Sequence, residues 1–173
     1  MDLRYPVGKF VAPDHATDEQ RRQFIDEIEA TPARLRAAVA GLSDEQLDTP
    51  YRPDGWTVRQ VVHHLPDSHL NSYTRFRLAL TEDEPTIKPY YEDRWAELAD
   101  ARTAPPEVSL DLLETLHRRW VLLLRSLGPA DFARSFRHPE LGIVTLEKST
   151  ALYAWHGRHH IAQITGLRER MGW

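Results

Sequence analysis

The strongest structural signal in the chain is the segment 109–128, which reads SLDLLETLHRRWVLLLRSLG. Apolar side chains recur in it three and four residues apart, which is the period of one face of an α-helix. They are Leu112, Leu113, Leu116, Trp120, Leu123, Leu124 and Leu127. Ser109 precedes this pattern as a candidate N-cap, and Gly128 follows it as a candidate stop. The segment therefore predicts an amphipathic helix with one buried face.

Three further segments, 17–42, 57–80 and 146–170, show the same apolar period. A Ser or Thr followed three residues later by Gln forms a capping box, which marks a helix start. Such pairs begin at Thr17, Ser43 and Thr57, and the one at Ser43 predicts only a short turn of helix. Four long amphipathic helices bury their apolar faces most simply against one another. We therefore expect an all-α, four-helix bundle.

Two prolines interrupt the predicted helices. Pro32 lies within the first of them and indicates either a kink or the first position of a restarted helix. Pro66 lies within the second. Either it kinks that helix, or the helix breaks there and Asp67 caps a new one.

The length of 173 residues fits a single domain, 1–173, and its first sixteen residues indicate an extended N-terminal arm. Residues 81–106 hold four prolines and form a connection of about 25 residues between the second and third long helices, with a short helix near residues 93–98. This length allows a crossover instead of a plain helical hairpin. Residues 132–144 suggest a small hairpin or a loop.

Composition excludes several classes of protein. The 22 basic and 26 acidic side chains are interspersed and give a net charge of -4, so neither nucleic acid nor an anionic membrane surface is an expected partner. No apolar run is long enough to span a bilayer, and no signal peptide is visible, so we expect a cytoplasmic protein. The absence of cysteine excludes thiolate metal ligands and a cysteine nucleophile.

Histidine is over-represented, with nine residues where average usage gives about four. Residues 155–160 read WHGRHH and lie inside the fourth predicted helix. His156 and His160 are one turn apart, so both rings project from one face and can reach a common metal ion. An i, i+4 pair of histidines is a moderate signal, and it supplies only two of the three protein ligands that a catalytic zinc needs.

The second predicted helix offers a third ligand in the pair His63 and His64. These neighbours cannot both face the core, and His64 falls in the arc of Val61 and Leu65. We therefore expect His64 to be the ligand, with His63 either on the surface or supporting the site. Asp67 could orient a ligand ring by accepting its second N–H, although a lone His-His pair or carboxylate on a helix is more often solvated.

Several segments together resemble the YfiT-like branch of the DinB superfamily. They are GWTVRQVVHHL at 55–65, NSYTRF at 71–76, TIKPY at 86–90, WAEL at 95–98 and YAWHGRHH at 153–160, with YPVG at 5–8 and LRERMGW at 167–173. The resemblance spans nearly the whole chain. Pro66 departs from the branch, which places a small polar residue there.

This resemblance implies a DinB-type four-helix bundle, a homodimer, and a site for one divalent ion per chain, Zn²⁺ or Ni²⁺. The pattern of the family is one histidine from the second helix and an H-x-x-x-H pair from the fourth. Carried over to this chain, these residues are His64, His156 and His160.

Three functions follow from such a site. The branch is described as metal-dependent hydrolases, and related members are described as transferring the small thiol bacillithiol to electrophiles. An ion with an open position can activate water for hydrolysis or bind a small-molecule thiol as the nucleophilic thiolate. Thiol transfer is our first hypothesis because the chain has no cysteine of its own, and metal-dependent hydrolysis is the second. The third is a non-catalytic metal-binding module.

Overall fold

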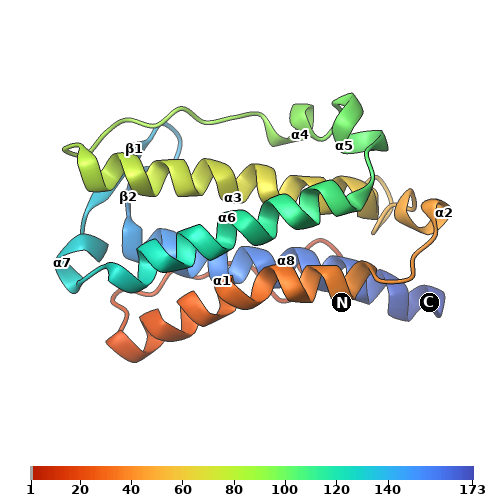
Figure 1. Ribbon diagram of the computed structural model, residues 1–173, viewed down its shortest axis with the longest axis horizontal. Helices are drawn as coiled ribbons and strands as arrows, with labels where there is room; N and C mark the ends of the chain where they lie inside the picture. The colour runs from red at the N-terminus through yellow and green to blue at the C-terminus, as the bar shows by residue number, and fades with distance from the viewer. Residues whose placement is uncertain (1) are drawn as a thin grey trace.

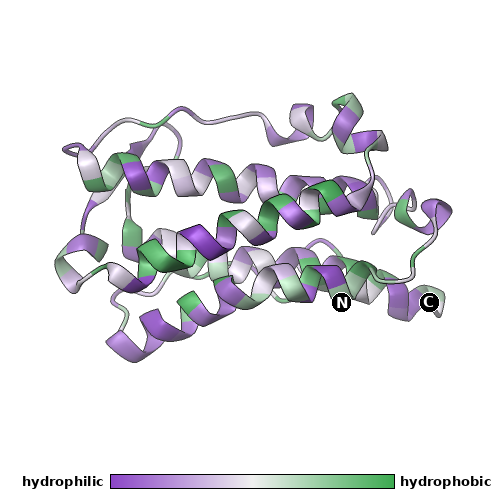
Figure 2. Ribbon diagram, in the orientation of Figure 1, coloured by the Kyte–Doolittle hydropathy of each residue, from purple (hydrophilic) through white to green (hydrophobic). Residues whose placement is uncertain are grey.

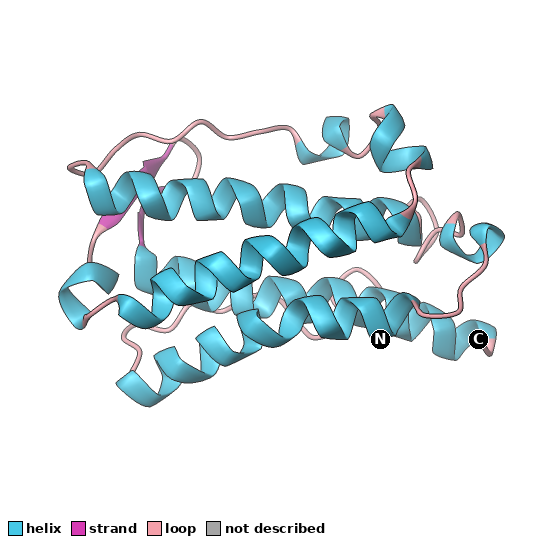
Figure 3. Cartoon of the chain, viewed as in Figure 1, coloured by secondary structure: helices cyan, strands magenta, loops and turns pink. Residues whose placement is uncertain are grey.

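The computed structural model describes residues 2–173, and its regular secondary structure is almost entirely helical (Figure 3). Four long helices lie side by side as a bundle (Figure 1), as the sequence predicts. They are α1 (Asp18–Val39), α3 (Val58–Thr81), α6 (Pro106–Ser126) and α8 (Leu146–Met171). Each carries hydrophobic and hydrophilic residues interleaved along its length (Figure 2), which is the composition of a helix with one buried face.

The order of the helices is not a simple up-and-down arrangement. Figure 1 shows α1 and α8 running in one direction, and α3 and α6 running in the other. The connection between α3 and α6 therefore returns along the length of the bundle, carrying the short helices α4 (Glu92–Trp95) and α5 (Ala99–Thr103). This is the crossover that the long, proline-rich connection predicts. Two further short helices, α2 (Asp44–Leu47) and α7 (Pro129–Phe132), lie at the ends of the bundle.

A small antiparallel hairpin closes one end of the bundle. It consists of β1 (Ser135–His138) and β2 (Gly142–Thr145), paired so that Ser135 faces Thr145. Gly142 has φ of 72°, a left-handed conformation that glycine adopts without strain, so the chain turns there into β2. Of the two sequence-based alternatives for this segment, the hairpin is the one formed.

The predicted capping boxes begin α1, α2 and α3. The side chain of each Ser or Thr accepts a hydrogen bond from the backbone N–H of the Gln three residues on. The side-chain oxygen of that Gln accepts a hydrogen bond from the backbone N–H of the Ser or Thr. Ser109, however, is not an N-cap. Helix α6 begins one turn earlier at Pro106, whose fixed φ suits the first helical position, and Ser109 lies inside the helix.

Both internal prolines lie within continuous helices. Pro32 is inside α1 and Pro66 is inside α3, and both are buried. No restart occurs at Thr31, and Asp67 does not cap a new helix. Burial of the surrounding apolar faces outweighs the one backbone hydrogen bond that each proline removes.

The interior contains two groups of buried apolar side chains. One surrounds Trp120, which is fully buried, together with Phe76 and Ile28, and it lies toward the hairpin end. The other surrounds Leu65 and Leu113 toward the opposite end. Helices α3, α6 and α8 also contribute buried histidines to the interior. Among residues 2–173, none of the helices combines the length and the apolar character that crossing a bilayer requires.

Candidate metal centre

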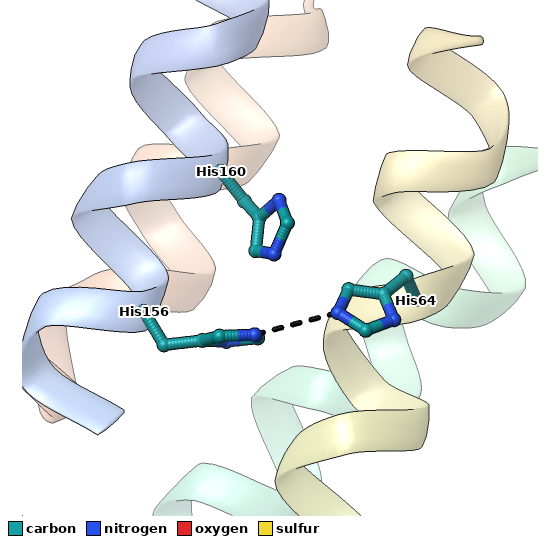
Figure 4. A group of neighbouring side chains, drawn as sticks. All are labelled: His64, His156 and His160. Atoms are coloured by element: carbon teal, nitrogen blue, oxygen red, sulfur yellow. Dashed lines mark hydrogen bonds between the residues drawn. The ribbon is translucent and has the colours of Figure 1, made fainter. Parts of the chain in front are cut away.

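Three histidines from two helices converge inside the bundle. Figure 4 shows His64 projecting from α3 toward His156 and His160, which project one turn apart from α8. One nitrogen from each ring can be chosen so that all three lie within 4.8 Å of one another. The Nε2 atoms of His64 and His156 are 3.3 Å apart. The structure therefore brings together the three residues that the sequence singles out.

This donor set fits a divalent metal ion. Imidazole nitrogens bind zinc at about 2.0–2.1 Å in tetrahedral geometry, which places neighbouring ligand nitrogens about 3.3 Å apart. The Nε2 atoms of His64 and His156 have that separation. The ring of His160 lies edge-on to both others, with ring centroids 4.8 Å from His64 and 4.5 Å from His156. The three rings thus surround one point with nitrogen donors.

The surroundings of these rings favour neutral imidazoles, which are the form that binds metal. Burial, followed by the neighbouring His159, lowers the pKa of His64 to about 4. Burial is likewise the main reason that the pKa values of His156 and His160 fall well below their ordinary value, and the nearby histidines add to this effect. The nitrogen lone pairs are consequently available near neutral pH.

A cavity of about 920 Å³ opens onto the histidine cluster. Among its lining residues are all three histidines, together with Trp56, Ser68 and Tyr90. His156 is partly exposed, whereas His64 and His160 are buried. An ion held by three protein nitrogens would therefore have its remaining position directed at a space large enough for a small molecule.

Two of the three rings are held from behind by hydrogen bonds. The Nδ1–H of His160 donates to Oε1 of Gln163 (2.9 Å). The amide nitrogen of Gln163 donates to the carbonyl of Arg4 (3.1 Å), an acceptor only, which fixes the orientation of the amide and places Oε1 toward His160. His156 lies with Nδ1 3.1 Å from Nε2 of His69. These partners hold the rings in place and leave Nε2 free to face the common point.

The two supporting residues suggested by the sequence have other partners. His63 binds Ser109 Oγ (2.7 Å) and the carbonyl of Ala104 (3.1 Å), so it joins α3 to the start of α6. Asp67 makes no hydrogen bond with the three rings in the described chain, and its pKa is raised to about 6, first by burial and then by repulsion from Asp100. The residues behind the ligand rings are His69 and Gln163.

Sequence reasoning missed both of these residues, although a signal exists. His69, His117 and Gln163 are polar residues in the apolar stripes of α3, α6 and α8, and all three are buried. A buried polar side chain requires a hydrogen-bond partner. Polar residues at predicted core positions therefore indicate an internal hydrogen-bonded network, but they do not say which pairs form.

Comparison with known proteins places the chain in a family. A model of the DinB superfamily matches residues 27–164. A "Putative metal-dependent hydrolase" of Bacillus mycoides is 57% identical over 172 residues, and one of Bacillus cereus is 56% identical over 172 residues, each with 99% of both chains covered.

Solved structures agree with this placement. YfiT from Bacillus subtilis, described as a probable metal-dependent hydrolase with an unusual four-helix bundle topology, superposes with a TM-score of 0.98 at 53% identity and covers 100% of this chain and 99% of its own. A second four-helix bundle protein shares the fold at a TM-score of 0.56 and 21% identity, covering 82% of this chain and 94% of its own. With a family match over most of its length and relatives of this identity, the chain belongs to the DinB superfamily.

Proposed function

We propose that this protein is a divalent-metal-dependent enzyme acting on small molecules, with His64, His156 and His160 as the metal ligands. One observation carries the proposal. Three imidazoles from α3 and α8, of which His64 and His160 are buried and His156 is partly exposed, converge on one position beside a cavity of about 920 Å³. Three protein nitrogens with one side open to a cavity is the arrangement typical of catalytic metal sites, whereas structural sites enclose the ion with four protein ligands.

The donor set determines what the site can do. Three neutral ligands leave the full charge of a divalent ion uncompensated, and an ion held in this way supplies Lewis-acid chemistry that lowers the pKa of a small nucleophile such as water or a thiol. His69 and Gln163 keep the rings oriented. The tilted ring of Trp56 is centred 4.7 Å from that of His64 and lines the same cavity.

Hydrolysis is the first candidate reaction. The relatives that match the chain over 99% of its length carry names of metal-dependent hydrolases, and an ion held by the three histidines with one position open could activate water. Thiol transfer is the second candidate. It is favoured by the absence of cysteine from the sequence, since the cavity of about 920 Å³ beside the rings would then receive its thiol from a small molecule. A thiol has a pKa near 8.5 and needs less help to ionise than water does.

Zn²⁺ or Ni²⁺, one ion per chain, suits three imidazole ligands. Elemental analysis of the purified protein tests this assignment directly. We expect about one divalent ion per chain, lost in His64→Ala and His156→Ala and retained in His15→Ala, which alters an exposed histidine outside the cluster. Metal content that does not change in the two cluster variants would contradict the ligand assignment.

The reaction is tested with the metal-loaded protein and two classes of substrate. Esters and amides are offered without thiol, and a haloaromatic electrophile is offered with a small thiol. Hydrolysis predicts metal-dependent turnover in the first assay, whereas thiol transfer predicts it in the second. A homodimer in the cytoplasm is the further expectation from the family, and light scattering coupled to size exclusion measures the dimer.

A further inference from the structure

A continuous file of hydrogen-bonded imidazoles leads away from the candidate metal centre into the core. Nδ1 of His156 lies 3.1 Å from Nε2 of His69, and Nδ1 of His69 lies 2.8 Å from Nε2 of His117. Nδ1 of His117 lies 2.6 Å from the backbone carbonyl oxygen of Ile28 in α1. The file therefore joins all four long helices, since His69 lies on α3, His117 on α6 and His156 on α8.

The carbonyl at the end of the file is available because of a proline. In an α-helix the carbonyl of Ile28 would accept a hydrogen bond from the backbone N–H four residues later. That residue is Pro32, which has no N–H. Because Ile28 is fully buried, its carbonyl needs another donor. His117, which is 1% exposed, supplies it.

This starting point fixes the proton positions along the file. A carbonyl oxygen only accepts, so the hydrogen of His117 lies on Nδ1, and a neutral ring then presents a bare Nε2 to His69. His69 consequently donates from Nδ1 and accepts at Nε2. His156 must donate from Nδ1, which leaves a lone pair on its Nε2.

The opposite assignment fails at the first link. If His117 carried its hydrogen on Nε2, the bare Nδ1 would face the carbonyl oxygen of Ile28, and two acceptors would be in contact in the core. A charged ring anywhere in the file would force a hydrogen onto Nε2 of His156. Burial of His69 and His117 disfavours such a charge. One tautomer of each ring therefore satisfies all the contacts.

We propose that His69 and His117 are positioning residues, which transmit the acceptor character of the Ile28 carbonyl to His156 and hold its Nε2 bare for the metal ion. The proposal rests on the metal site assigned above, but its tautomer part applies to the metal-free protein as well. His160 does not need such a file, because Gln163 on the next turn of the same helix provides its acceptor.

Within residues 2–173, the far end of the file does not reach solvent. Its far end is a backbone carbonyl of a residue that is 0% exposed, which cannot release or take up a proton. The role that follows is orientation and tautomer selection, not proton delivery. Partners of this kind, located behind a ligand ring, typically contribute 10–100-fold to metal affinity.

The first test reads the tautomers directly. Two-bond proton–nitrogen spectra of the metal-free protein, labelled with ¹⁵N at histidine and assigned with single-histidine variants, distinguish Nδ1–H from Nε2–H rings. We expect His69, His117 and His156 all to carry the hydrogen on Nδ1. A hydrogen on Nε2 of either His117 or His156 would overturn the proposal, and this measurement does not require metal binding.

The second test compares two substitutions at one position. His117→Gln offers an amide N–H to the carbonyl of Ile28 and an amide oxygen to Nδ1 of His69, so the file is preserved. His117→Leu fills the space but offers neither group. With Zn²⁺ as the probe, we expect the dissociation constant to rise 10–100-fold in His117→Leu and by less than about threefold in His117→Gln. Equal affinity in the two variants would refute the role of His117.

These tests separate the two proposals. If the wild-type protein binds no Zn²⁺, the assigned metal site fails, while the tautomer spectra still decide whether the file exists. If the wild-type protein binds Zn²⁺, and this binding is abolished by His64→Ala but unchanged by His117→Leu, the assigned metal site is supported and the role of the file is refuted. Spectra of His117→Leu should also show a mixture of tautomers at His69, a change that general destabilisation of the fold would not produce.

Discussion

At the scale of the residue, two adjacent histidines on α3 show that the direction in which a side chain projects decides its partners. His63 and His64 are both buried, yet the first binds Ser109 on α6 and the second faces α8 across the candidate metal centre. The helix turns by about 100° per residue, so neighbours in sequence have different partners in space. The selection of His64 from its apolar neighbours agrees with this geometry, because the arc of Val61 and Leu65 faces the interior.

Asp67 provides a test by pH at the residue scale. Its pKa in the folded protein is raised to about 6 from 3.8, chiefly by burial. Because the folded state binds this proton more tightly, the carboxyl destabilises the fold once it ionises, so stability is lost as the pH rises from about 4 through 6. We expect Asp67→Asn to raise the free energy of unfolding at pH 7.5 and to have little effect at pH 3.5. Urea unfolding at pH 7.5 and at pH 3.5 measures this free energy, and Asp14→Asn, at an exposed position, is the control. A variant that is less stable at pH 7.5 would contradict the assigned environment.

Gly157 provides a second test at this scale. A Cβ at this position would lie 2.6 Å from Oγ1 and 2.8 Å from Cγ2 of Thr31, a buried, β-branched side chain on α1. Gly157→Ala should gain about 1 kcal/mol of helix propensity but lose about 1–3 kcal/mol to overpacking. We expect a net loss of about 1 kcal/mol in the free energy of unfolding.

The matched control for Gly157→Ala is the same change in a Thr31→Ala background, where both close atoms are absent. There the substitution should lose its penalty, which a double-mutant cycle in urea detects as a coupling energy. Additive effects of the two changes would show that the approach of α1 to α8 does not depend on this glycine.

At the scale of the element, the ends of the helices follow local sequence closely. The capping boxes at Thr17, Ser43 and Thr57 begin helices where the sequence predicts. Each box satisfies two backbone N–H groups by hydrogen bonds between residues that lie within four positions of each other. The prediction that Ser109 caps α6 is wrong, because the helix begins one turn earlier at Pro106. The hydroxyl of Ser109 instead forms a hydrogen bond with His63, which lies 46 residues away in the sequence.

The cap of α3 supports a prediction about this element. Thr57→Ala removes the side-chain acceptor for the backbone N–H of Gln60 at the start of the helix that carries His64. We expect a loss of about 1 kcal/mol in the free energy of unfolding. Thr57→Ser retains the acceptor and should lose much less. Thermal or urea unfolding of the two variants side by side measures the difference, and equal losses would mean that the cap does not stabilise α3.

At the scale of the whole molecule, the bundle is held by two apolar cores, neither of which includes a proposed metal ligand. The metal-free protein should therefore remain folded after chelation. A structural metal would behave differently, because its removal unfolds small metal-dependent domains. Circular dichroism of the chelated protein tests this expectation, and loss of the helical signal at 25 °C would favour the non-catalytic metal-binding module.

Adding metal back should stabilise the whole fold. An ion that binds only the folded state contributes about 2.7 kcal/mol when its free concentration is 100 times the dissociation constant. We expect Zn²⁺ to raise the melting temperature of the wild-type protein and to leave that of His64→Ala unchanged. A similar rise in both would place the bound ion somewhere other than the histidine cluster.

The sequence by itself predicted the four long helices and the three histidines that the fold brings together. Helical period, capping boxes and the i, i+4 histidine pair are encoded within a few residues of one another, so they can be recognised without knowledge of the fold. Only the tertiary structure decided that Pro32 and Pro66 stay inside continuous helices, and that His69, His117 and Gln163 stand behind the cluster. His69 and His117 contact partners that are 48 to 89 residues away in the chain. The amide of Gln163 is oriented by Arg4, which is 159 residues away, and no local pattern records these pairings.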